Sequence, residues 1–418
     1  MRKIKYSAIA VSFLLSIAII FNFTSCAMKV NAANLMEGIQ AEDLGTPDPL
    51  TNAQAAKATD FAIRLFKACN ETGKNTLVSP LSVMIALSMT ANGAKGQTKT
   101  QMETVLGMST DELNSYFRSY MDALPSSDKI KFNLANSIWF TADERFTVNK
   151  SFLQTNANYY GADAYKKPFD DTTLKEINDW VSKKTDGMIK NVLDKIPADA
   201  VMYLINALAF EAEWEEIYSE ELVYKSEFTL ADGTKQIVDF MHSREYKYLE
   251  DEKATGFIKN YKGRYAFVAL LPNEGVTVDE YISYLDAQKI NELLSNPTIT
   301  NVSASMPKFE TEYDTEMSEV LKAMGMPVAF DSSIADFSDL GQSTVGNIFI
   351  GRVIHKTYIS VAEKGTRAGA ATVVEMKDES IGEPVQAKRV YLDRPFVYML
   401  IDNETNVPFF IGTLNNVG

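Results

Sequence analysis

The run Val201–Phe210 (VMYLINALAF) constrains the fold more than any other segment, because it is apolar at every position except Asn206. Such a run is typical of a central β-strand that is covered on both faces. Tyr265–Leu271 and Phe396–Ile401 are shorter runs of the same kind. The chain is therefore expected to build a sheet that lies between other layers.

Helical patterns prevail in the first half of the chain, and strand patterns prevail later. The pair Ser79-Pro80 predicts the start of a helix, with Ser as the N-cap and Pro at the first helical position. The segment Thr173–Glu176 has the spacing of a capping box and predicts another helix start. In Val353–Val361, alternate residues share one strand face. This order of elements predicts an α+β fold.

The composition excludes several classes of function. The 418 residues include 41 Lys and Arg against 55 Asp and Glu, a formal charge of −14, which disfavours a nucleic-acid partner. The two histidines and two cysteines cannot supply a zinc site with the usual spacing, so no metal or cofactor is expected. The sequence also lacks G-x-S-x-G, H-E-x-x-H and Walker motifs, which argues against a hydrolase or any other enzyme.

The first 32 residues have the pattern of an export signal. Basic residues within the first five positions precede an apolar stretch, Ala8–Phe21, that is too short for a comfortable membrane span. Cleavage before Cys26 would make a lipoprotein, because Phe23–Cys26 resembles a bacterial lipobox. Cleavage after Ala32 would release a secreted protein, and both remain open. Residues 33–50 are interpreted as a tether and 51–418 as one domain.

The segment Glu363–Val374 (EKGTRAGAATVV) is patterned for two states. Small and β-branched residues make it read as a loop, yet alternate positions from Thr366 to Met376 are all small or apolar. Alternation of this kind is typical of a strand with one buried face. A segment patterned both as a loop and as a strand is a candidate conformational switch.

These segments resemble the serpins, the family of serine protease inhibitors, from about Asn52 to the end of the chain. The switch segment matches the family's loop hinge. Asn75–Gln97 resembles its second helix, and Leu204–Trp214 resembles the sheet strand at which the loop inserts. Arg394–Phe396 and Phe409–Gly412 resemble its C-terminal signature. The resemblance implies helices packed on mixed β-sheets with an exposed reactive-centre loop.

The resemblance also implies roles for individual residues. The hinge would comprise Glu363, Gly365, Thr366, Ala368, Ala370 and Thr372. The shutter, a polar cluster where strands of the sheet part, would comprise Ser79, Ser82, Asn206 and His355. Trp214 and Lys308 would mark the insertion point, with an ion pair between Lys308 and Glu363.

The family's loop length places the scissile bond at Glu379–Ser380, with cleavage after Met376 or Lys377 as alternatives because the following stretch is longer than the common pattern. The expected partner is a serine protease, glutamyl-specific or else trypsin- or subtilisin-like, trapped by a monomeric inhibitor. The expected setting is a bacterial cell surface or the extracellular space, with membrane contact only through a lipid on Cys26. The alternative is a non-inhibitory serpin-fold protein that acts in binding or as a scaffold.

Overall fold

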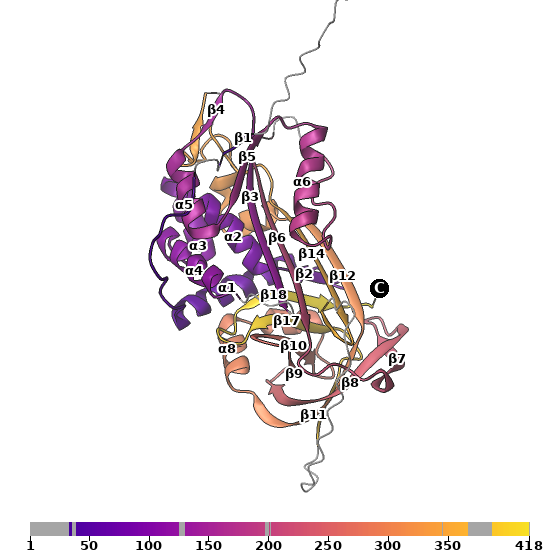
Figure 1. The fold of residues 1–418 in the computed structure, drawn as a ribbon. Helices are drawn as coiled ribbons and strands as arrows, with labels where there is room; N and C mark the ends of the chain where they lie inside the picture. Colours follow the sequence, from indigo (N-terminus) through magenta and orange to yellow (C-terminus); the bar gives the residue numbers. More distant parts are fainter. Residues whose placement is uncertain are drawn as a thin grey trace, which may run out of the picture. The chain divides into compact units, whose positions relative to one another are not determined.

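The computed structural model describes residues 33–35, 39–124, 130–196, 200, 202–344, 346–366 and 387–417 (Figure 1). All of them belong to one compact unit, Ala32–Gly418, and the preceding unit, Met1–Asn31, lies outside the described residues. None of the helices described is long and apolar enough to cross a membrane.

The helices lie mostly in the first half of the described chain, as the sequence predicts. They are α1 (Asn52–Cys69), α2 (Pro80–Ala91), α3 (Gly96–Leu106), α4 (Thr110–Asp122), α5 (Lys150–Tyr160), α6 (Asp171–Lys184), α7 (Val278–Tyr284), α8 (Ala287–Ser295) and α9 (Ser318–Met324), with the 3-10 turns η1 (Glu220–Leu222) and η2 (Pro327–Phe330).

A seven-stranded mixed sheet forms in the described part of the chain, in the order β1-β5-β3-β6-β15-β14-β12. Its strands are β1 (Ala33–Asn34), β5 (Asp163–Lys167), β3 (Ile130–Thr141), β6 (Met202–Glu213), β15 (Gly365–Thr366), β14 (Ile354–Ala362) and β12 (Phe309–Glu316). β3 and β5 run parallel, whereas the other neighbours are antiparallel.

A second mixed sheet runs in the order β16-β11-β8-β9-β10-β17-β18-β2, with β7 paired to β8. Its strands are β16 (Lys388–Tyr391), β11 (Thr298–Pro307), β8 (Lys235–Glu250), β9 (Ala254–Asn260), β10 (Tyr265–Pro272), β17 (Phe396–Asp402), β18 (Pro408–Leu414), β2 (Thr76–Val78) and β7 (Val223–Thr229). A short ladder joins β4 (Phe146–Val148) to β13 (Gly341–Ser343).

The central strand β6 is apolar because two different cores cover its two faces. Leu204, Leu208 and Phe210 belong to the main core, to which α2 also contributes. Tyr203 and Ile205 point into a second core with residues of α6. Figure 1 accordingly shows α1 to α5 gathered on one side of β3 and β6, and α6 on the other. Because both faces of β6 are buried, its sequence is apolar at successive positions instead of alternating between apolar and polar residues.

One predicted helix start is wrong. α6 begins at Asp171, and its N-cap is Asp170, whose side chain accepts a hydrogen bond from the Thr173 backbone N–H at 2.9 Å. Thr173 is therefore inside the first turn. Glu176, the other half of the predicted box, pairs with Lys167 instead. Asp is a stronger N-cap than Thr, and its side chain binds the Thr173 N–H, so the helix begins three residues earlier than the box predicts.

Candidate functional site

Two residues of the predicted hinge already form a strand. β15 consists of Gly365 and Thr366, which pair with Glu213 and Ala212 of β6 on one side and with β14 on the other. Gly365 has φ +150°, and a Cβ there would lie 2.0 Å from the Ala212 carbonyl oxygen. Only glycine fits this close approach between backbones. The chain therefore enters the sheet at this residue.

Thr366 faces the interior and is 2% exposed. Its hydroxyl shares a hydrogen bond with the hydroxyl of Tyr261. The Tyr261 ring stacks on Trp214, with centroids 4.2 Å apart and planes 10° from parallel. Burial raises the pKa of Tyr261 well above its usual value, so the hydroxyl stays neutral and available for this bond.

The segment Trp214–Tyr218 binds the backbone of the hinge. The backbone N–H of Trp214 donates to the Lys364 carbonyl at 2.9 Å, and that of Tyr218 donates to the Glu363 carbonyl at 3.0 Å. The Trp214 indole N–H donates to the carbonyl of Ala362, the last residue of β14, at 2.8 Å. Trp214 and Tyr218 together therefore bind three consecutive carbonyls, and the Trp214 ring itself binds that of Ala362.

The expected ion pair between Lys308 and Glu363 is present, with Nζ and Oε1 2.6 Å apart. Burial raises the pKa of Glu363, but the hydrogen bond from Lys308 and a backbone hydrogen bond outweigh it, so the pKa lies below its usual value. Both side chains remain about one-third exposed. The pair fixes Glu363, which lies two residues before β15, at the edge of the hinge.

Ser79, Ser82 and His355 come together where α2 meets β14. The Ser79 backbone N–H donates to Nε2 of His355 at 3.0 Å, and the Ser79 hydroxyl donates to the Ser82 hydroxyl at 2.9 Å. Ser79 caps α2, as predicted, and Pro80 is its first residue. Thr357, two residues along β14, donates to the Leu77 carbonyl at 2.7 Å. These bonds tie β14 to the segment that leads into α2.

His355 is held neutral by its surroundings. It is 5% exposed, and burial lowers its pKa to about 4. Because Nε2 accepts the Ser79 N–H, that nitrogen carries no proton. The other predicted shutter residue, Asn206, lies opposite Asn136 in the ladder between β6 and β3. The side chain of Asn206 lies outside the described part of the structure.

Several predicted positions lie outside the described residues. They are Cys26, Ala368, Ala370, Thr372, Met376, Lys377, Glu379 and Ser380. Their assignments stay predictions, as do the boundaries of the signal and tether.

Sequence reasoning missed two residues that contact the site. Tyr261 lies 47 positions after Trp214, and nothing in the sequence around it points to the hinge. Thr357, by contrast, shares the buried face of His355, so the strand alternation could have identified it.

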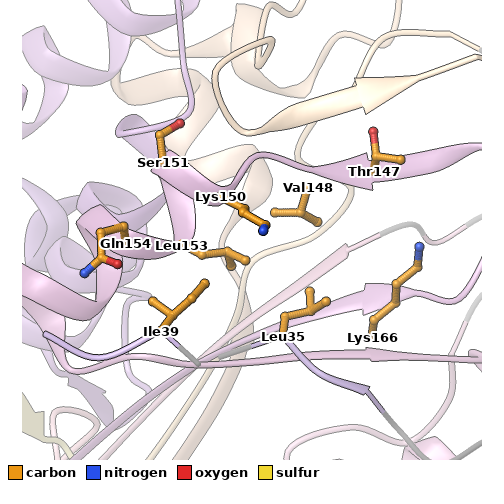
Figure 2. Close-up of a pocket in the computed structure, with 9 residues that line it drawn as sticks. All are labelled: Leu35, Ile39, Thr147, Val148, Lys150, Ser151, Leu153, Gln154 and Lys166. Atoms are coloured by element: carbon orange, nitrogen blue, oxygen red, sulfur yellow. The ribbon is translucent and has the colours of Figure 1, made fainter. Parts of the chain in front are cut away.

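A cavity of about 630 Å³ lies apart from the predicted site residues (Figure 2). Leu35 and Ile39 line it together with residues of β4, β5 and α5. Nearby, the Leu35 N–H donates to the Ala164 carbonyl at 3.0 Å, and Gln154 donates to the Gln40 carbonyl at 2.7 Å. The described residues between 33 and 50 thus contact β5 and α5, and their role as a tether stays a prediction.

Comparison with known proteins agrees with this geometry. Residues 56–417 match the serpin (serine protease inhibitor) family. Ipis-1 of Ixodes persulcatus is 30% identical, with 86% of this chain and 97% of that protein covered. An uncharacterized serpin-like protein of Thermococcus kodakarensis is also 30% identical, covering 89% of this chain and 87% of its own length.

The similar solved structures include a thermophilic serpin, tengpin, in two states. In its native state it has a TM-score of 0.88 and 48% identity, covering 93% of this chain and 100% of its own. In its latent state the TM-score is 0.80 and the identity 46%, with 89% of this chain and 100% of the other covered. The family match over residues 56–417 and these similarities lead to one conclusion: the chain belongs to the serpin family.

Proposed function

We propose that this chain is an exported inhibitor of serine proteases that traps its target by inserting its cut loop into the seven-stranded sheet. The observation that carries the proposal is β15, whose two residues already pair with both β6 and β14. In the described strand order, β6 and β14 have no ladder of their own and are linked through β15. The boundary between them can therefore accept a longer strand.

The register of β15 supports insertion of the segment that follows it. Thr366 lies opposite Ala212 of β6 and Val361 of β14. An inserted strand that keeps this register would place Thr372 between Asn206 and His355. The residues that face inward with Thr366 would all be small or apolar as far as Met376.

The proposed reaction begins as ordinary proteolysis. The serine Oγ of the protease attacks the carbonyl carbon of Glu379, and the amide nitrogen of Ser380 leaves with a proton. The new ester joins the protease to the end of the loop. Insertion from Gly365 to Glu379 would carry the protease roughly 50 Å, at ~3.3 Å per strand residue. Distortion of its oxyanion hole would then prevent water from releasing it.

Such a mechanism requires a native fold that is kinetically trapped. In keeping with this, the chain is more similar to the native than to the latent state of tengpin, with TM-scores of 0.88 and 0.80. Export is proposed from the signal pattern, with a lipid anchor on Cys26 or release after Ala32 as the two routes. Glu379 makes a glutamyl-specific protease the first candidate target.

The test is incubation with glutamyl-specific, trypsin-like and subtilisin-like serine proteases, followed by denaturing gels. A covalent complex is expected with one of them, together with release of the 39-residue peptide Ser380–Gly418. A peptide that starts at Lys377 or Asp378 would move the scissile bond to an alternative position. Cleavage without a complex, and without a gain in heat stability of the cut protein, would favour a non-inhibitory serpin.

A further inference from the structure

A buried ion pair lies directly behind the segment that holds the hinge. Lys259, at the end of β9, is 2% exposed, and its ammonium lies 2.9 Å from a carboxylate oxygen of Glu245 in β8. The Ser243 hydroxyl donates to the same carboxylate oxygen at 2.6 Å. Lys259 also lies over two aromatic rings, 4.4 Å from the centroid of Tyr218 and 5.5 Å from that of Trp214.

Stability alone does not explain this pair. Removing two charges from water costs several kcal/mol per ion, and well-packed apolar residues of similar volume are often as stabilising or more so. A cation over an aromatic face, in contrast, restricts where the ring can lie, and the attraction strengthens when water is absent. We therefore interpret the ion pair as a contact that fixes the positions of the Trp214 and Tyr218 rings.

Those two residues also bind the hinge. Their backbone N–H groups donate to the carbonyls of Lys364 and Glu363, and the Trp214 ring stacks on Tyr261, which binds Thr366. A shift of the Trp214–Tyr218 segment would thus move every one of these contacts together. Among the described residues, the Lys259 ammonium binds Glu245 rather than the hinge, so Lys259 acts through the Trp214–Tyr218 segment.

We propose that Lys259, held by Glu245, is a positioning residue that keeps the Trp214–Tyr218 segment docked on the hinge and so sets where loop insertion starts. The effect on loop insertion rests on the proposed function. The positioning of the two rings and the hinge by the buried charge pair can be tested on the unreacted protein.

The main variant is the charge-free pair Lys259→Met with Glu245→Leu, which keeps the volume and leaves no buried charge unpaired. Hydrogen exchange of the peptide containing Gly365 and Thr366 is expected to become at least tenfold faster. The urea midpoint should stay near that of the parent protein, because the apolar pair replaces the ionic one. A purely structural role would leave hinge exchange unchanged.

Trp214 emission gives a second readout. The chain has three Trp, so Trp139→Phe and Trp180→Phe leave Trp214 as the sole reporter. In this background the charge-free pair is expected to shift the emission spectrum. The matched control is Lys289→Met in α8, which removes an ammonium that pairs with Asp286 and lies 4.7 Å from the centroid of the Tyr284 ring, and neither readout should change. If the charge-free double variant cannot be purified in a folded state, Glu245→Gln replaces it. Hinge exchange and Trp214 emission should then change in the same direction.

Inhibition is measured separately. We measure how many inhibitor molecules are consumed for each protease molecule trapped, with a protease that the parent chain traps. This number should be at least twofold higher for the charge-free variant than for the parent chain. If the parent chain traps no protease, the proposed function fails, while exchange and emission still test the positioning role. Parent-like hinge exchange and parent-like Trp214 emission in the charge-free pair would overturn the inference.

Discussion

The Ser79 backbone N–H donates to Nε2 of His355 across 3.0 Å, so the link between the start of α2 and β14 depends on a neutral imidazole. Protonation of Nε2 would replace this bond with two opposed donors. The bond also lies at the boundary along which the sheet is proposed to open. The strength of the contact between α2 and β14 therefore depends on pH.

The first prediction concerns pH. Burial lowers the pKa of His355 to about 4 from an unfolded value of ~6.5, so between these values the unfolded chain binds a proton that the native chain does not. The free energy of unfolding should therefore decrease as the pH falls from 6.5 to 4, by ~3 kcal/mol from this residue. Urea unfolding at several pH values measures it.

The variant His355→Ala removes the titration and isolates its contribution. The difference in unfolding free energy between parent and variant should shrink steadily as the pH is lowered from 6.5 to 4. A difference that does not vary with pH would show that His355 titrates alike in both states.

The second prediction concerns conversion of the native state. His355→Ala leaves the buried Ser79 N–H without its partner, at a cost of ~1–3 kcal/mol. Faster formation of polymer or latent monomer is expected on mild heating, measured by native gels over time. The control is His242→Ala, which removes a ring stacked on Tyr224 in the second sheet, away from the boundary. Equal rates for both variants would assign His355 to ordinary core packing.

The third prediction concerns Thr366. Thr366→Arg should turn an inhibitor into a substrate, because an arginine would be buried without a partner beside Tyr261. Since Thr366 is already within the sheet, the variant should also release β15, seen as faster hydrogen exchange at Gly365. The control Thr366→Val keeps the size and branching, and should still form the complex. An undiminished complex yield for the arginine variant would contradict insertion along this face.

The fourth prediction concerns the ion pair at the hinge. Glu363→Gln should change the global unfolding free energy by less than ~1 kcal/mol, because both partners are partly exposed. It should nevertheless speed conversion to latent or polymeric forms, since Glu363 lies only two residues before Gly365, where insertion starts. Glu312→Gln is the control, because Glu312 pairs with Lys356 at 2.8 Å between β12 and β14 of the same sheet. Identical conversion rates for the two variants would remove the special role of Glu363.

The sequence alone predicted those features whose causes are local or periodic. Apolar runs identified β6, β10 and β17, because a strand covered on both faces needs apolar residues at successive positions. Alternation placed His355 on a buried face of β14, and the Ser79-Pro80 pair marked the start of α2. The Thr173 capping box failed because Asp170, a stronger N-cap than Thr, precedes it.

Which distant residues meet at the hinge depends on how the strands and sheets pack in three dimensions. Tyr261 reaches Thr366 across 105 positions, and Lys259 finds Glu245 and the Tyr218 ring on other segments. No local pattern encodes such contacts, because they depend on the pairing of strands and on how two sheets pack. The sequence determined that this segment could become a strand. The fold determined that two of its residues, Gly365 and Thr366, already form one, since β6 and β14 leave a place for them.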